Sequence, residues 1–363
     1  MIREEEDSLL PYLCPPGSGV YTVFTGREQR LGLQQTLYGC TDQAAESAWQ
    51  KTLQTLSVDN RPLCLGICSD SGGGIHRGAN WGPLAMREAL YAQVPEWFPM
   101  ELGDVRIIPQ LLLDEYVSES LLHTCRQALY GDAEAKRPVS PLSIAYVCAQ
   151  WIYARYPHRF LLGLGGDHSC AYPLVKAYLE HKKKQSRRAA VIHFDAHTDM
   201  MASRLGIPIC FGSWVYHVLP DLFTPACWVQ VGIRASGRPR HHWESQYGIR
   251  QFWAEEIREN GAVAVAEAII SHLEPYGVDE LYVTFDIDAL DASIASATGT
   301  PERDGLSVEE AQTIIKALKA AYPVTGADMM EVAPFIHYTG QKGSRESTLR
   351  AAVKILTTLI NSE

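Results

Sequence analysis

Three side chains of types that bind metal ions occur at alternate positions in the DAHTD segment at residues 195–199. They are Asp195, His197 and Asp199, and they follow a β-prone, mostly apolar run at residues 189–194. Alternate side chains of an extended segment point to the same face, so these three can converge as a strand ends. The plainer alternative is a solvated loop whose carboxylates cap the next helix. Carboxylate and imidazole groups in this pattern predict a metal site.

Two further apolar runs end in residues of the same types. His168 follows the run at residues 159–164, and Asp286 and Asp288 follow the run at residues 280–285. Open α/β sheets place their chemistry outside the carboxyl ends of the strands, so the three ends should meet. Four carboxylates brought together would raise one another's pKa unless cations neutralised them.

The set of two imidazoles and four carboxylates suits Mn, Fe, Co, Ni or Zn better than calcium or a thiolate-bound ion. Six ligands suffice for two ions if carboxylates bridge, and such ions lie about 3.5–4 Å apart. A water held between them would become a nucleophile near neutral pH.

Alternating strand and helix patterns along the chain would position these groups. They predict an α/β protein with three layers, α/β/α, and a mostly parallel central sheet. The strands expected from apolar runs are residues 63–68, 105–108, 159–164, 189–194, 227–233, 280–285 and 324–331. Ser140 before Pro141 predicts a helix start, and Ser307 with Glu310 predicts a capping box.

No linker divides the chain after about residue 60. We therefore expect residues 1–60 to be an N-terminal extension, packed on the main domain or on a neighbouring subunit, and residues 61–363 to be one catalytic domain. Nothing in the sequence alone gives the extension a function.

Composition excludes several classes of partner. The chain has 363 residues, 46% of them hydrophobic and 20% charged, and a net charge of -10 at pH 7. Its basic runs are short, so we expect no binding to nucleic acid. No apolar run is long enough to predict a membrane span, and the acidic N-terminus is unlike a signal peptide. The 9 cysteines are scattered and odd in number, which favours reduced thiols in a cytoplasmic protein.

The chain resembles the ureohydrolase family, which includes arginase, agmatinase, guanidinobutyrase and formimidoylglutamase. The resemblance runs from about residue 66 to the C-terminus. It is carried by GICSDSGGGIHRGANWGPLAMREAL at residues 66–90, GLGGDHS at 163–169, DAHTD at 195–199, FDIDALD at 285–291 and MEVAP at 330–334. It implies an arginase-like fold, a small guanidino substrate, and two divalent metal ions per chain, with manganese or nickel expected. It also implies a homo-oligomer, a trimer or a hexamer.

Matched by position, the family's metal ligands fall on six residues of this chain. The resemblance assigns one ion to His168, Asp195, Asp199 and Asp286, and the other to Asp195, His197, Asp286 and Asp288. Asp195 and Asp286 would bridge the two ions.

The resemblance also implies roles in catalysis and substrate binding. Asp199 would accept a hydrogen bond from the attacking hydroxide, and Glu331 would pair with the substrate guanidinium through a charge-assisted bidentate contact. Asp167 would either fix an imidazole as a hydrogen-bond acceptor or close an Asx-turn.

One departure from the family concerns proton transfer. The family places a histidine before a glycine about a dozen residues after DAHTD, whereas this chain has Phe211 there. His217 is the next imidazole downstream, and we expect it either to take over proton transfer or to be structural. Phe211, Trp214 and Tyr216 are expected to line a small, partly apolar substrate pocket together with Glu331.

Three functions therefore remain open. The leading one is a binuclear-metal hydrolase that cleaves a C–N bond of a guanidino compound, either an agmatine-like amine, a guanidino acid or guanidine itself, and releases urea. The second is formimidoylglutamase-type hydrolysis, which releases formamide. The third is a catalytically silent relative with a structural or regulatory role, which the intact set of ligands disfavours.

Overall fold

The computed structural model describes residues 8–20, 24–95, 99–338 and 343–361. Within these residues a sheet of nine strands forms in the order β1-β3-β2-β4-β9-β8-β5-β6-β7. Every pairing is parallel except that of β1 with β3. The strands are β1 (Leu13–Cys14), β2 (Leu63–Ile67), β3 (Met100–Val105), β4 (Leu161–Gly165), β5 (Ala189–Phe194), β6 (Trp228–Ile233), β7 (Arg250–Trp253), β8 (Glu280–Asp286) and β9 (Val324–Met330). The expected mostly parallel sheet is confirmed.

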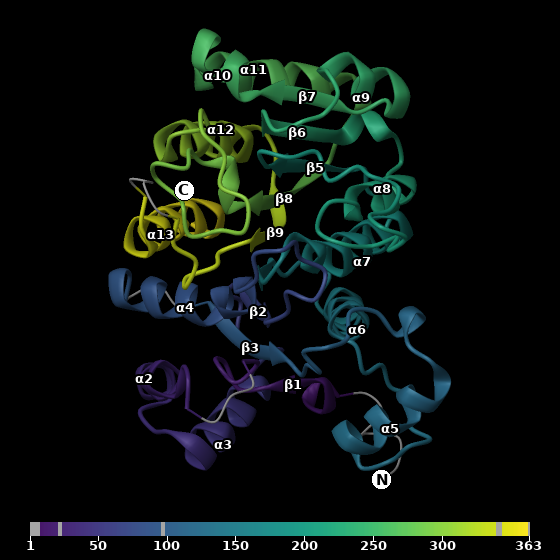
Figure 1. Ribbon diagram of the computed structural model, residues 1–363, viewed down its shortest axis with the longest axis vertical. Coiled ribbons are helices and arrows are strands. Elements are labelled where there is room, and N and C mark those ends of the chain that lie inside the picture. Colours follow the sequence, from purple (N-terminus) through teal and green to yellow (C-terminus); the bar gives the residue numbers. More distant parts are fainter. Residues whose placement is uncertain (1–7, 21–23, 96–98, 339–342, 362–363) are drawn as a thin grey trace.

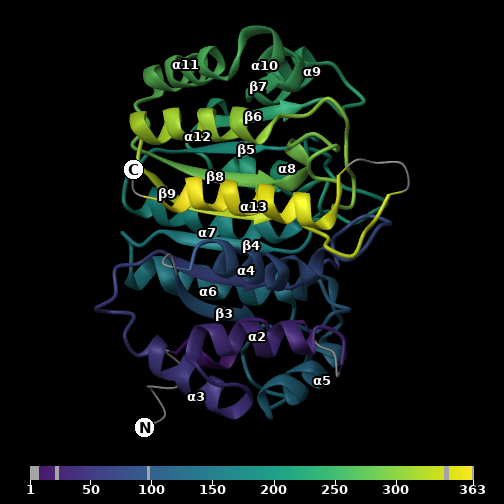
Figure 2. The same ribbon diagram turned by 90° about the vertical axis from the view of Figure 1, so that its left-hand side faces the viewer.

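Helices cover both faces of this sheet. Helices α4, α12 and α13 lie in front of it in Figure 2, whereas α6 and α7 lie on the far side, as Figure 1 also shows. The α-helices are α2 (Arg27–Tyr38), α3 (Asp42–Leu53), α4 (Gly82–Gln93), α5 (Glu119–Tyr130), α6 (Pro141–Arg155), α7 (Ala171–Lys184), α8 (Trp214–Val218), α9 (Arg240–Tyr247), α10 (Ala254–Asn260), α11 (Ala262–Leu273), α12 (Val308–Ala321) and α13 (Arg345–Ile360). The arrangement is the three-layer α/β/α fold.

Two helix starts follow the sequence signals. Ser140 is the N-cap of α6 and Pro141 opens that helix, where its missing N–H is not needed. Ser307 and Glu310 form a reciprocal capping box at α12, which satisfies two otherwise unpaired backbone donors. Both signals are confirmed.

The N-terminal segment joins the main domain. Strand β1 pairs with the edge strand β3, and the indole N–H of Trp49 on α3 donates to Leu102 O at 3.0 Å. Gly19 N donates to Asp104 Oδ2 at 2.9 Å. These contacts place the described part of residues 1–60 against the rest of the same chain, whereas its separation as an extension stays a prediction.

The strand expected at residues 105–108 is wrong by several positions, because β3 spans Met100–Val105. Its sequence, MELGDV, contains two acidic residues, which are uncommon in buried strands, so the sequence pattern does not predict a strand there. Both acids are buried beside Arg87 of α4, which lies 2.9 Å from Glu101 and 2.5 Å from Asp104. A buried ion cluster therefore replaces the apolar contacts that the sequence pattern expects.

We expect Arg87→Leu to lower the free energy of unfolding by about 3–5 kcal/mol, because removal of one partner leaves buried carboxylates without a counter-charge. Urea denaturation measures this change. Arg240→Leu is the matched control, since Arg240 pairs with Glu256 at the surface and such pairs contribute about 0–1 kcal/mol. Equal losses of unfolding free energy in the two variants would contradict a stabilising role for the buried ion cluster around Arg87.

Among the residues with described structure, no helix is both long and apolar enough to cross a membrane. The nine cysteines all lie within the described ranges, as free thiols.

Candidate metal centre

Three strand ends share one local design. At the carboxyl ends of β4, β5 and β8, an aspartate side chain accepts a hydrogen bond from the backbone N–H two residues further on, which closes an Asx-turn. The pairs are Asp167 with Ser169 (2.9 Å), Asp195 with His197 (2.6 Å) and Asp286 with Asp288 (2.8 Å). Each turn holds the next polar side chains at the carboxyl edge of the sheet. Of the two roles expected for Asp167, the contacts show the Asx-turn.

A first cluster surrounds His168. Its Nδ1 atom lies 3.0 Å from Asp195 Oδ2, 3.2 Å from Asp199 Oδ2 and 3.1 Å from Asp286 Oδ2. All four side chains are buried, and His168 Nδ1 has no hydrogen-bond partner among the described atoms. The structure thus brings together the four residues that the family resemblance assigned to one ion.

A second cluster surrounds His197. Its Nδ1 atom lies 3.4 Å from Asp195 Oδ1 and 3.1 Å from Asp288 Oδ2. Asp195 therefore turns one carboxylate oxygen toward each imidazole, the arrangement that a bridging ligand needs. Asp286 Oδ2 faces the first cluster and its Oδ1 accepts from Asp288 N, so a bridging role for Asp286 stays a prediction.

The electrostatics of the two clusters favour cations. Burial raises the pKa of Asp286 well above its usual range, and the charges of Asp288 and Asp195 raise it further. Burial and Asp195 likewise raise the pKa of Asp199. A divalent ion would remove this penalty, and imidazole nitrogen with carboxylate oxygen is a donor set suited to first-row divalent metals. The residues present therefore fit the metal centre that the sequence predicts.

Outer contacts hold the candidate ligands in place. His168 Nε2 lies 3.0 Å from Thr284 Oγ1, and that hydroxyl donates to Asp328 Oδ1 at 2.7 Å. Gln230 Nε2 lies 3.0 Å from His193 Nδ1, so His193 donates from Nε2 to Asp195 Oδ2 at 2.9 Å. Such partners fix the orientation of ligands.

The sequence reasoning missed these outer residues. Two of them carried a usable signal, because His193 and Thr284 lie two residues before the candidate ligands Asp195 and Asp286 and so face the same side of their strands.

Trp214 lies behind the ligands. It is fully buried, and its indole N–H donates to Asp199 Oδ2 at 2.9 Å. Asp199 has a φ of 52°, a conformation that costs free energy in a residue other than glycine. The contacts of Trp214 thus make it a support for the strained candidate ligand Asp199, and its expected place in the substrate pocket stays a prediction.

Glu331 follows β9 and lies beside the first cluster. Its φ is 65°, and its Oε1 accepts from His168 N at 2.9 Å. Burial raises the pKa of its carboxyl group well above the usual range, and the charge of Asp167 raises it further. A bound cation would favour the ionised carboxylate.

A cavity of about 540 Å³ opens over this region. Residues from several loops line it, among them Gly74, His76, His197, Phe211, Thr300 and Tyr338. The Phe211 ring lies against Gly74, where an added Cβ would be only 3.2 Å from the ring. Phe211 is thus a wall of the cavity, and its expected place in the substrate pocket stays a prediction.

Tyr216 and His217, both on α8, have their described contacts elsewhere. Tyr216 is 37% exposed and packs against Tyr247 and His217. His217 Nε2 lies 3.0 Å from Ala202 O, and no described contact joins its side chain to a residue of the two clusters. Its role in proton transfer stays a prediction.

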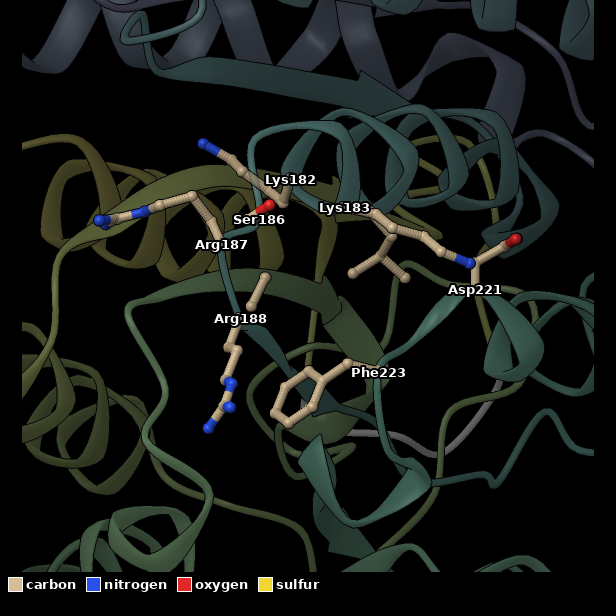
Figure 3. A pocket seen from close by; sticks show the side chains of 9 residues that line it. Lys182, Lys183, Ser186, Arg187, Arg188, Asp221 and Phe223 are labelled. Carbon is tan, nitrogen blue, oxygen red and sulfur yellow. The ribbon is translucent and has the colours of Figure 1, made fainter.

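A second pocket lies at the opposite edge of the sheet, beside Ala189 at the start of β5. Figure 3 shows the basic side chains around it and Arg188 next to Phe223. Lys182 and Arg187 are already paired with Glu280, at 2.7 Å and 3.0 Å. These basic side chains form structural ion pairs with the sheet. We therefore place the functional site at the other edge, where the carboxyl ends of the strands lie.

Known proteins resemble the chain in sequence and in fold. An agmatinase of Chromobacterium violaceum is 36% identical over 283 residues, which cover 77% of this chain and 76% of that protein. A guanidinobutyrase of Pseudomonas aeruginosa is 32% identical over 183 residues, or 49% of this chain and 54% of that protein. The crystal structure of a hypothetical agmatinase from Burkholderia thailandensis has a TM-score of 0.60 and 29% identity, over 83% of this chain and 85% of its own. An arginase from Bacillus subtilis, at 23% identity and a TM-score of 0.64 over 84% of this chain and 99% of its own, shows the fold alone.

The fold and the site define a metal-dependent hydrolase acting on C–N bonds of amidine or guanidino compounds. The model of the Arginase family matches residues 62–361. The chain belongs to the Arginase family, and the resemblance stated from its motifs is confirmed.

Proposed function

We propose that the protein hydrolyses a small guanidino compound to urea and an amine, using two divalent metal ions. The observation that supports it most strongly is a pair of ligand clusters that share Asp195, beside the buried carboxyl group of Glu331. The six ligands would hold the ions, which supply positive charge and lower the pKa of a bound water. The relatives named as agmatinase and guanidinobutyrase support the substrate class.

The chain's own residues bind and orient the substrate in this proposal. Glu331 forms an ion pair with the substrate guanidinium. The positive charge of the guanidinium stabilises the ionised carboxylate, which burial alone disfavours. Asp199, held by Trp214, orients the attacking oxygen by accepting a hydrogen bond. The wall formed by Phe211 favours a narrow substrate.

A screen for urea release tests the function. Agmatine, ω-guanidino acids of increasing length, arginine and guanidine are compared with formimidoylglutamate, for which formamide is measured. Urea from at least one guanidino compound is expected. Formamide alone would support the amidine alternative, and no product with a full metal complement would indicate the silent relative.

Metal removal is expected to abolish activity. Chelation followed by dialysis should leave an inactive protein, and manganese or nickel should restore activity at two ions per chain, because carboxylates and imidazoles discriminate weakly between these ions. Elemental analysis of the restored protein measures the ratio. A maximum of one ion after saturation with every candidate metal would contradict the binuclear centre.

We further propose that the chain forms a homo-oligomer, a trimer or a hexamer. Light scattering coupled to size-exclusion chromatography determines the mass, and a monomer at micromolar concentration would contradict this proposal.

A further inference from the structure

Hydrolysis of a guanidinium ion requires a proton at the departing nitrogen. A C–O bond forms to water and a C–N bond breaks, and the electron pair of the broken bond goes to nitrogen. An amide anion is too basic to leave, so this nitrogen must be protonated as the bond breaks. Some group near the substrate must supply that proton, and positioned general acids contribute about 10²–10⁴-fold to the rate.

Five titratable side chains line the cavity in the described part of the chain, namely His76, His197, Arg204, Glu302 and Tyr338. The contact with His197 lowers the pKa of Glu302, which favours its ionised form, a form without a proton to donate. His197 faces Asp288 through Nδ1 and Glu302 through Nε2, at 3.1 Å and 3.6 Å. The guanidinium of Arg204 does not lose its proton near neutral pH. His76 also lines the cavity, and its described contacts involve neither ligand cluster.

The hydrogen bonds of Tyr338 fix the tautomer of His76. The Tyr338 hydroxyl lies 2.6 Å from Gly299 O and 2.6 Å from His76 Nδ1. A carbonyl oxygen only accepts, so the single phenol hydrogen goes to Gly299 O. His76 must then donate from Nδ1, which leaves Nε2 of the neutral ring free to take up a proton. Burial raises the pKa of Tyr338, and the Glu331 carboxylate raises it further, so its hydroxyl stays protonated.

Gly299 connects this pair to the substrate site. A Cβ added at Gly299 would lie 3.4 Å from His76 O and 3.5 Å from Glu331 Oε2. Gly299 is thus flanked by the backbone of His76 and by the carboxylate that we expect to hold the guanidinium, and the His76 side chain lines the same cavity as His197. The Phe211 ring packs on Gly74 in the same loop and cannot transfer a proton itself.

We propose that His76 transfers a proton to the departing nitrogen and that Tyr338 is its positioning residue, an inference that rests on the proposed function. His76 takes up at Nε2 the proton that water releases on attack, and passes it to the nitrogen as the C–N bond breaks. The ring begins and ends neutral. The second water proton reaches the product amine through solvent, because the amine is a stronger base than urea.

Kinetics of matched histidine variants test the proposal. We expect His76→Ala to lower kcat by at least about tenfold with unchanged metal content, and added imidazole to restore part of the loss. Tyr338→Phe should lower kcat less and shift its pH profile. His241→Ala is the control, since His241 is exposed on α9 and lines no part of the cavity.

The outcomes separate the two proposals. Wild-type protein that releases no urea from any guanidino compound overturns the proposed function. Wild-type activity with undiminished kcat in His76→Ala overturns the role of His76 alone, and loss of kcat in His217→Ala would then assign proton transfer to His217.

Nitrogen NMR of the histidine side chains adds a test that does not depend on activity. His76 should be mainly the Nδ1–H tautomer, and Tyr338→Phe should reduce that preference. A predominant Nε2–H tautomer in the wild type would overturn the positioning role of Tyr338.

Discussion

Asp195→Ala is expected to empty both metal positions and to lower kcat/KM by at least about 10³-fold. The variant removes the one side chain whose two oxygens face both His168 and His197. Without the ions, the negative charge that develops in the transition state loses several kcal/mol of stabilisation. A loss of that size corresponds to a decrease of about 10³-fold in kcat/KM. Elemental analysis and the urea assay, carried out on the same preparation, measure both effects.

Two variants make this test specific. His168→Ala should lose mainly one ion, because this imidazole belongs to the first cluster only. Asp132→Ala removes an exposed aspartate that caps a surface turn, and it should keep both ions and full activity. If Asp195→Ala kept two ions, the bridging assignment would be wrong.

The sequence was sufficient to predict that the candidate ligands lie together, because their geometry is local, whereas their role as metal ligands stays a prediction. The residues at each strand end are separated by one position, and the Asx-turns of Asp195 and Asp286 involve only the next two residues. The alternation of side chains along a strand and the aspartates that close the turns are therefore enough to predict which side chains converge. The parallel sheet then brings the separate strand ends to one edge.

The support for these ligands could not be predicted in the same way. Asp328 lies 44 residues from Thr284, and Tyr338 lies 262 residues from His76, so only the tertiary fold joins them. Trp214 is in the expected segment, but its place behind Asp199 depends on how the loop turns after that ligand. Strand β3 was misplaced for a related reason, since the partner of its acids is a buried arginine on a helix.

Glu331→Gln is expected to lower kcat/KM by about 10²–10³-fold while both metal ions remain. The neutral side chain can still accept the hydrogen bond from His168 N, so the local structure should persist. It can no longer pair with a guanidinium charge, and truncation of one partner of a buried charge pair costs about 2–5 kcal/mol. The loss should fall largely on KM, because the contact is made in the bound substrate as well as in the transition state.

Steady-state kinetics with the preferred guanidino compound measure the change. Glu267→Gln is the matched control, because Glu267 is exposed on α11 and is not among the residues that line the cavity, and it should leave kcat/KM nearly unchanged. A Glu331→Gln enzyme with wild-type kcat/KM would show that the guanidinium binds elsewhere.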